Sequence, residues 1–144
     1  MTSILNYIKI NDFISTSGQP TKKQFKKIAK NNFEVIINLA LYNSDNALKN
    51  EDKIINKNNM IYLHIPISWD KPQHDRLKLF CTILQTLQNK NTKVFIHCAK
   101  NYRVSIFMHY YFKNILNIKD KKFKAPKKYT PNKTWQKILK LKQL

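Results

Sequence analysis

Short apolar runs alternate with longer amphipathic segments along this chain. The short runs are rich in β-branched and aromatic residues and predict strands at 7–10, 13–15, 33–39, 60–65 and 94–98. The longer segments repeat apolar residues at a spacing of three or four and predict helices at 21–31, 47–57, 72–89, 104–112 and 132–142. Strands that alternate with helices are typical of an α/β fold. We therefore expect a mainly parallel sheet of four to five strands, flanked by helices on both faces.

The length of 144 residues is typical of one domain with a substantial core. We expect residues 1–144 to form a single domain. A lysine-rich connector at about 118–128 would precede the C-terminal helix at about 132–142.

The most informative segment is the end of the strand at 94–98, together with the helix that follows it. The strand leads through His97 to Cys98, and apolar bulk recurs at helical spacing from residue 104. A short loop between a strand and a helix leaves backbone N–H groups near the positive end of the helix dipole, where anions bind. Cys98 and Arg103 bracket this loop, so a nucleophile and a planar, two-pronged donor would flank the anion.

Phosphate suits this arrangement. Helix N-termini and nearby cations favour the thiolate form of cysteine, and Lys100 and Arg103 supply the cations. The thiolate could attack phosphorus in line and form a cysteinyl-phosphate while Arg103 holds the equatorial oxygens; water would then complete the hydrolysis. The alternative is a structural Cys98 that ends a core strand and precedes a solvated basic turn.

The expected phosphate cradle is the backbone of the loop itself, from Ala99 through Lys100, Asn101 and Tyr102 to Arg103. This loop contains no glycine. Because asparagine tolerates the left-handed conformation better than most residues do, we expect Asn101 to occupy any left-handed position there.

The loop sequence from His97 to Ser105 resembles the signature loop of the cysteine-dependent protein tyrosine and dual-specificity phosphatases. More closely, the chain resembles a small bacterial phosphatase-like family related to the phosphatase-like domain of the β-lactamase hydrolase-like proteins. Further motifs carry this resemblance in the right order, at 16–21, 35–40, 44–48, 64–67 and 131–135. The resemblance implies a tyrosine phosphatase-like fold, a phosphate monoester substrate and no cofactor. One departure is that four residues separate Cys98 from Arg103, where the better-known phosphatases have five.

The resemblance also implies a hydroxyl that steadies the leaving thiolate, on a Ser or Thr directly after the arginine. Val104 holds that place here, and Ser105 follows it. Ser105 keeps the usual spacing from Cys98 and loses the usual spacing from Arg103. We therefore take Ser105 as the candidate for this role.

A phosphatase of this kind needs a general acid to protonate the departing oxygen. Trp69 and Asp70 resemble the mobile acid loop of the tyrosine phosphatases, which makes Asp70 the candidate acid. The alternative is an ordinary turn or N-cap aspartate. Asp45 and Asn38 lie where loops leave the far end of a strand, and either could position substrate, although Asp45 could equally cap a helix.

Charge points to anionic partners. Lys and Arg together number 27 against 8 Asp and Glu, for a formal net charge of +19. Phosphoproteins, nucleic acid and acidic lipid head groups all fit this charge. The densest basic run, at 118–128, is either a solvated connector or a surface for a phosphate-rich partner. The sequence makes no prediction of an oligomeric state.

Two cysteines, Cys81 and Cys98, argue against a disulfide framework and favour a reducing compartment. Cys81 lies in the apolar stripe of the helix at 72–89, which predicts a packing role. We see neither a secretory signal nor the roughly 20 apolar residues that a membrane span needs, so we expect a cytoplasmic protein. No His, Cys, Asp or Glu spacing suggests a metal site.

The residues thus favour a cysteine-dependent phosphatase that acts on phosphotyrosine or another phosphate monoester. Two other functions stay open. One is a rhodanese-like sulfurtransferase, because rhodanese-type enzymes also use a four-residue loop. The other is a non-catalytic pseudo-phosphatase that binds anions or nucleic acid, which the glycine-free loop and the high charge would suit. The fold alone cannot choose a substrate.

Overall fold

A five-stranded mixed sheet organises the computed structural model, which describes residues 1–119 and 124–142. The strand order is β1-β2-β5-β3-β4. The strands are β1 (Ile8–Lys9), β2 (Ile14–Ser17), β3 (Val35–Asn38), β4 (Ile61–His64) and β5 (Val94–His97). β2, β3, β4 and β5 run parallel, whereas β1 pairs antiparallel with β2. The sheet is therefore mixed, because the chain turns straight back between β1 and β2 without a crossover helix.

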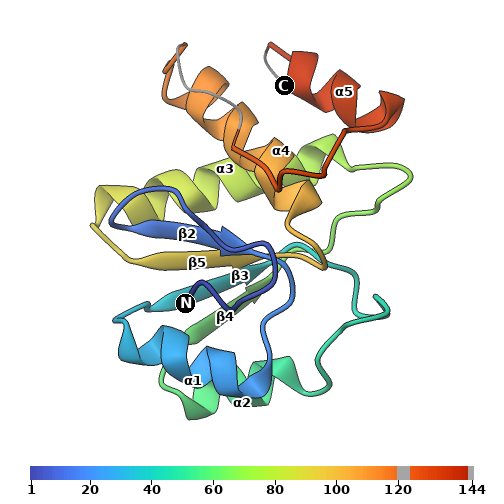
Figure 1. Ribbon diagram of the computed structural model, residues 1–144. Coiled ribbons are helices and arrows are strands. Elements are labelled where there is room, and N and C mark those ends of the chain that lie inside the picture. Colours follow the sequence, from blue (N-terminus) through green and yellow to red (C-terminus); the bar gives the residue numbers. More distant parts are fainter. Residues whose placement is uncertain (120–123, 143–144) are drawn as a thin grey trace.

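Helices cover both faces of this sheet (Figure 1). One face carries α1 (Lys22–Lys30) and α2 (Glu51–Lys57), and the other carries α3 (His74–Asn89) and α4 (Tyr102–Tyr110). α4 continues into a π-helical turn, η1 (Tyr111–Ile115), and α5 (Lys133–Lys140) packs against α4. The predicted α/β fold with flanking helices is confirmed.

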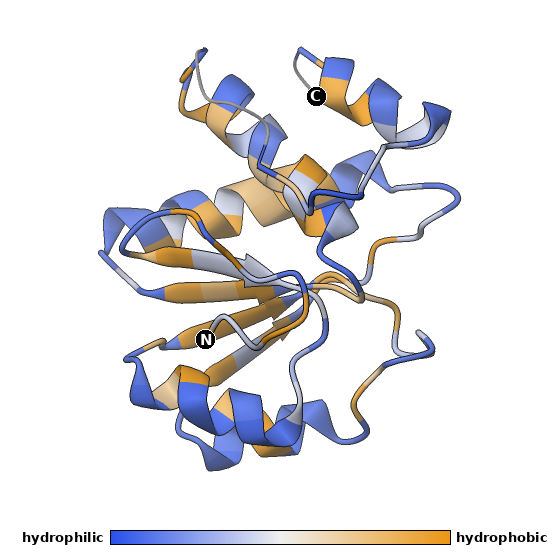
Figure 2. Cartoon of the chain, viewed as in Figure 1, coloured by the Kyte–Doolittle hydropathy of each residue, from blue (hydrophilic) through white to orange (hydrophobic). Residues whose placement is uncertain are grey.

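Both faces of the central strands are buried, which explains their nearly continuous apolar sequence. In β3, Ile36 packs toward α1 and α2, whereas Ile37 packs toward α3 and α4. Phe95 and Ile96 of β5 divide in the same way. Figure 2 shows the result: apolar strands lie inside, and the outer faces of the helices are hydrophilic.

Local capping residues set the start of two helices. The Thr21 hydroxyl accepts from the backbone of Gln24, and the Gln24 side chain accepts from the backbone of Thr21, which forms a capping box before α1. Asn132 caps α5 by accepting from the backbone N–H of Trp135. α5 then buries Trp135 and Ile138 against the rest of the protein.

The prediction was wrong about the start of α2. This helix begins at Glu51 rather than at 47, because residues 41–50 form a loop that ends with Asn50 in the left-handed conformation. Part of the basic run predicted at 118–128 falls on 120–123, outside the described residues. Among the residues that the structure describes, no helix is long and apolar enough to cross a membrane.

Candidate active site

The loop from Cys98 to Asn101 joins the central strand β5 to α4. On either side of β5, Ser17 of β2 and Asn38 of β3 pair with His97. The carboxyl ends of three parallel strands therefore meet here, which is where open α/β sheets bind ligands. Cys98 thus stands at the centre of the sheet edge rather than at its margin.

Asn101 adopts the left-handed conformation that the sequence predicted, with φ 66° and ψ 17°. Its side chain is fully buried and donates hydrogen bonds to the main-chain oxygen of Asn6, at 2.8 Å, and to Oγ1 of Thr16, at 3.1 Å. The loop can therefore turn sharply into α4 without a glycine, because asparagine tolerates this backbone and also anchors it.

The carbonyl groups of the loop are tied to residues outside it. The Ala99 oxygen accepts from the backbone N–H of Gln19, at 3.0 Å, and from the side chain of Asn46, at 2.9 Å. The Lys100 oxygen accepts from the side chain of Asn6, at 2.9 Å. These bonds hold the loop from three segments: the residues before β1, the residues after β2 and the loop after β3.

Gly18 packs against the outside of this same loop. Its φ is not positive, so it is not required for a left-handed turn. A Cβ at this position would lie 2.7 Å from the Ala99 oxygen and 2.9 Å from Cδ2 of Leu5. The glycine permits a close approach to the backbone that follows Cys98.

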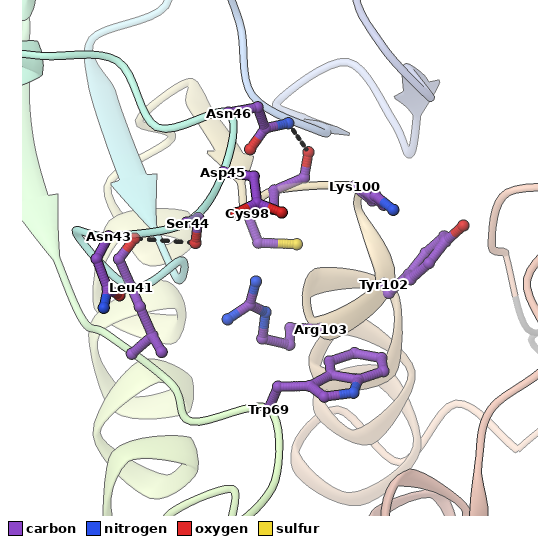
Figure 3. A pocket seen from close by; sticks show the side chains of 11 residues that line it. Leu41, Asn43, Ser44, Asp45, Asn46, Trp69, Cys98, Lys100, Tyr102 and Arg103 are labelled. Carbon is purple, nitrogen blue, oxygen red and sulfur yellow. Dashed lines mark hydrogen bonds between the residues drawn. The ribbon is translucent and has the colours of Figure 1, made fainter.

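A pocket of about 570 Å³ opens above the loop (Figure 3). Its walls are the loop after β3, the Trp69 side chain and the residues around Cys98. The lining includes five of the residues predicted for the site: Cys98, Ala99, Lys100, Tyr102 and Arg103.

Cys98 and Arg103 face each other across the floor of this pocket (Figure 3). The Cys98 side chain is only 1% exposed, and Arg103 is 7% exposed. Arg103 donates from Nη1 to the main-chain oxygen of Ile67, at 3.0 Å, and its Cζ lies 5.9 Å from the centre of the Trp69 ring. Its Nε has no hydrogen-bond partner among the residues described. A buried guanidinium that lines a pocket and has an unpartnered N–H is suited to an anion.

Asp70 does not line this pocket. It is exposed and borders a separate hollow beside Pro72, His74 and α5. The carboxylate that does line the pocket is Asp45, from the loop after β3 (Figure 3). Asp45 does not cap α2, whose N-cap is Asn50. Its position after the carboxyl end of β3 was the sequence signal for a substrate contact.

The side chains of Ser105 and Asn38 form hydrogen bonds away from the pocket. The Ser105 hydroxyl is buried and donates to the main-chain oxygen of Asn101, at 2.6 Å, so that it braces the first turn of α4. The Asn38 amide donates to Tyr62 and to Glu51. Neither side chain is part of the pocket lining. The role predicted for Ser105 beside the thiolate stays a prediction.

Aromatic side chains form the outer rim. Tyr102 stacks on Tyr129 with ring centres 4.1 Å apart and planes 4° apart. Trp69 packs on Trp135, whose Nε1 donates to the Trp69 main-chain oxygen at 2.9 Å. Burial, the nearby Cys98 and the nearby Tyr102 raise the pKa of Tyr129, so its hydroxyl keeps its proton at neutral pH. The C-terminal segment thus supports the rim of the pocket.

The two cysteines differ sharply. Cys81 is a buried residue of α3 and belongs to the hydrophobic core, in the packing stripe that the sequence predicted. Burial raises the pKa of its thiol to about 12. Cys81 is therefore an unreactive core residue, whereas Cys98 opens onto the pocket.

Comparison with known proteins agrees with this geometry. A family model described as Tc-R-P, polymorphic toxin system, DSP-PTPase phosphatase, matches residues 14–103. The matched segment runs from the start of β2 to Arg103 and makes up more than half of the chain. A search of curated proteins finds no match.

Solved structures share the fold. A DUF442 protein of Shewanella putrefaciens CN-32, described as a phosphatase, is 26% identical, with a TM-score of 0.84 over 96% of this chain and 91% of that chain. Tk-PTP is 16% identical, with a TM-score of 0.75 over 94% of each chain. TpbA of P. aeruginosa, solved in complex with pTyr, is 12% identical, with a TM-score of 0.64 over 78% of this chain and 65% of that chain. At their low identity, the last two show the fold alone.

The family match ends at Arg103 and so includes both residues that face each other across the pocket floor. The predicted resemblance to a small tyrosine or dual-specificity phosphatase is therefore confirmed. The chain belongs to the DSP-PTPase phosphatase family of polymorphic toxin systems, and it is a phosphatase, a hydrolase.

Proposed function

We propose that this protein hydrolyses phosphate monoesters through a cysteinyl-phosphate intermediate formed on Cys98. The observation that carries the proposal is the arrangement of the pocket floor. The Cys98 side chain and the Arg103 guanidinium, whose Nε has no partner among the residues described, face one another at the N-terminus of α4. Nucleophile, anion clamp and helix dipole therefore converge on one point.

The loop backbone supports phosphate binding. The carbonyl groups of Ala99 and Lys100 are engaged by partners outside the loop. When consecutive carbonyls are held outward, the peptide N–H groups turn inward and form an anion-binding concavity. Arg103 would add a charge-assisted hydrogen bond from Nε, while its bond to Ile67 keeps the guanidinium plane fixed.

The reaction has two displacements. The Cys98 thiolate attacks phosphorus, the S–P bond forms, and the ester P–O bond breaks as the departing oxygen takes a proton. Water then attacks phosphorus and gives a proton back to the carboxylate that supplied the first one, the S–P bond breaks, and inorganic phosphate leaves with the thiolate restored. Arg103 and the loop N–H groups stabilise the charge on the equatorial oxygens in both steps.

Two carboxylates compete to supply the proton. Asp70 follows from the family resemblance, but in this conformation it borders a different hollow, so it would act only after residues 68–72 move toward the pocket. Asp45 lines the pocket already, and the Asn46 bond to the Ala99 oxygen holds its loop against the loop of Cys98. In the conformation seen here, we assign the role of general acid to Asp45.

The rim favours a planar substrate group. Trp69 and Tyr102 line the pocket, and stacking fixes Tyr102 on Tyr129. An aromatic ring such as that of phosphotyrosine would bury apolar surface between these side chains while its phosphate reaches Arg103. The family match and the pocket floor do not favour sulfur transfer or simple anion binding.

The test is phosphate release from p-nitrophenyl phosphate by the wild type, Cys98→Ser and Cys81→Ser. We expect Cys98→Ser to lose about 10³-fold or more in activity, because serine is a far weaker nucleophile. Cys81→Ser is the matched control and should keep activity at permissive temperature. Mass spectrometry of the quenched wild type should find one phosphoryl group on Cys98.

Activity of Cys98→Ser close to that of the wild type would exclude the cysteinyl-phosphate. Transfer of sulfur from thiosulfate to cyanide without phosphate release would assign the site to sulfur transfer. Binding of polyanions with steep salt dependence and no turnover would assign it to a binding protein.

A further inference from the structure

The outer face of α1 carries positive charge that no residue of the helix balances. Its two large apolar side chains, Phe25 and Ile28, are fully buried, and the outer face is hydrophilic (Figure 2). The helix contains no acidic residue, and its five lysines are all exposed: Lys22, Lys23, Lys26, Lys27 and Lys30. Among the residues that the structure describes, none of the five pairs with a carboxylate. The mechanism above uses none of them.

This arrangement is unfavourable for the helix by itself. Lys22 and Lys26 are four positions apart, as are Lys23 and Lys27, so like charges are neighbours on the helix surface. Lys22 and Lys23 also lie in the first turn, where the helix dipole favours anions. An anion that lay along this face would relieve both repulsions.

The helix on the opposite face of the sheet has no such excess. The sixteen residues of α3 include one lysine, Lys78, together with Asp75 and the half-buried Arg76, which donates to a main-chain oxygen. Beside α1, in contrast, α2 adds two exposed lysines against one exposed aspartate. The two faces of the sheet therefore differ in charge.

The lysines of α1 begin at the edge of the pocket. The backbone N–H of Gln19 donates to the Ala99 oxygen at 3.0 Å, and α1 starts three residues later at Lys22. Lys100, which is exposed and lines the pocket, forms an isolated β-bridge with Gly18. Lys100 and the five lysines of α1 thus form a basic track. At 1.5 Å per residue, the track follows α1 for about 12 Å beyond Lys22.

The aromatic rim indicates which kind of anion fits the track. Trp69 and Tyr102 line the pocket, and Tyr102 stacks on Tyr129. Proteins that hold single-stranded nucleic acid combine a basic surface along the backbone with aromatic side chains on which bases stack. An acidic peptide would suit the lysines but would bring no base to the rim. A membrane-bound helix inserts apolar side chains, and the large ones of α1 are buried.

We propose that the basic track binds the backbone of a single-stranded nucleic acid whose terminal phosphate enters the pocket. This inference rests on the proposed function and names its substrate class. A terminal phosphate is a monoester, so the reaction is the one above. The S–P bond forms, the bond from phosphorus to the sugar oxygen breaks, and that oxygen takes the proton of the general acid. The diesters within the strand are not cleaved.

The first test is phosphate release from oligothymidylates of one, four and eight nucleotides that carry a 5′-phosphate. We expect kcat/KM to rise about tenfold or more from one nucleotide to eight, because each added phosphate meets further lysines. With the eight-nucleotide strand, the logarithm of kcat/KM should fall with that of salt concentration with a slope of about −2, since about three phosphates are neutralised. Equal kcat/KM at all three lengths would overturn the proposal.

The second test removes part of the track. One variant carries Lys22→Gln, Lys23→Gln and Lys26→Gln, because glutamine supports a helix about as well as lysine does. We expect its kcat/KM for the eight-nucleotide strand, relative to that for p-nitrophenyl phosphate, to fall about tenfold. The control carries Lys78→Gln, Lys90→Gln and Lys113→Gln, which remove the same charge from exposed positions of α3 and η1 and should leave the ratio unchanged. An unchanged ratio in the first variant, or an equal fall in both, would refute the track.

Two further outcomes would also overturn the proposal. One is a phosphotyrosine peptide with acidic flanks that reacts with a higher kcat/KM than the strand and depends on the same lysines, which would assign the track to a protein substrate. The other is tighter binding to phosphatidylserine vesicles than to the strand.

Binding of an eight-nucleotide strand without the 5′-phosphate, followed by fluorescence anisotropy, needs no catalysis. It should weaken in the α1 variant and not in the control. The opposite result rejects the track alone, whereas a wild type that releases no phosphate from p-nitrophenyl phosphate rejects the proposed function.

Discussion

The main-chain oxygen of Ile67 accepts a hydrogen bond of 3.0 Å from Nη1 of Arg103. This bond links the first turn of α4 to the segment that leads into Trp69. It fixes one edge of the guanidinium and leaves Nε without a partner among the described residues. One edge of the planar guanidinium therefore binds the protein backbone, and the other edge is available for the proposed phosphate.

Arg103→Lys should lower kcat/KM for p-nitrophenyl phosphate by about 10²-fold or more, because an ammonium cannot hold Ile67 and two phosphate oxygens in one plane. Arg76→Lys is the matched control. Arg76 also donates to a main-chain oxygen, that of Pro66, but lies outside the pocket lining. Steady-state kinetics of both variants decides the point. Equal losses in the two variants would mean that Arg103 only braces the fold.

The choice between Asp45 and Asp70 can be made with leaving groups of different quality. Loss of a general acid slows departure of a poor leaving group by about 10²-fold or more and scarcely affects a good one. We expect Asp45→Asn to lower the turnover of phenyl phosphate, which has a poor leaving group, by about 10²-fold or more. Turnover of dinitrophenyl phosphate, which has a good leaving group, should change little. Asp70→Asn should change both by a similar small factor. The reverse pattern would assign the proton to Asp70 and require its loop to close over the pocket.

Asn101→Ala should lower the free energy of unfolding by about 2 kcal/mol or more. A left-handed backbone costs alanine about 1–2 kcal/mol, and the bonds to Asn6 and Thr16 are lost as well. Asn101→Gly removes the same bonds without the backbone strain and should lose less. Denaturant unfolding measures both. The control is Asn32, which is also left-handed but exposed, and where glycine should be tolerated. Equal losses for alanine and glycine at 101 would refute the backbone explanation.

Gly18→Ala should disturb the loop from Cys98 to Asn101 through a single methyl group. The new Cβ would lie 2.7 Å from the Ala99 oxygen, so the backbone after Cys98 must shift. We expect a loss of about 1–3 kcal/mol in the free energy of unfolding and a fall in kcat/KM. Unfolding curves and kinetics should be measured on the same preparation. If neither changes, the close approach of Gly18 does not constrain the loop.

Glu51 should make the protein sensitive to acid. Its pKa is lowered in the folded state from the ordinary value of 4.5. At pH values above 4.5, Glu51 is ionised in both the folded and the unfolded protein, and its contribution to stability is fully present. As the pH falls below that value, the unfolded protein takes up the proton first. The contribution is then lost as the pH passes through the lower folded pKa. The free energy of unfolding of the wild type should therefore decline in this acidic range. In Glu51→Gln this part of the decline should be absent, and parallel curves for the two proteins would contradict the prediction.

Local pattern was enough to predict much of this protein. The apolar spacing predicted the strands, the helices on both faces and the strand-loop-helix unit around Cys98. Asparagine tolerance predicted the left-handed Asn101, because the conformation of one residue depends mainly on its own side chain. The ordered motifs predicted the phosphatase family, since their residues can be recognised along the chain without knowing how they pack.

Only the tertiary structure decided which distant groups meet. It brought Asp45 to the pocket and left Asp70 at another hollow, because the path of each loop depends on packing that neither local sequence encodes. It set Gly18 against Ala99 and paired Glu51 with His97, across 46 positions of the chain. Such contacts follow from the order of the strands and the placement of the helices. The sequence pattern therefore identifies which side chains could be functional, and the folded sheet determines which of them come into contact.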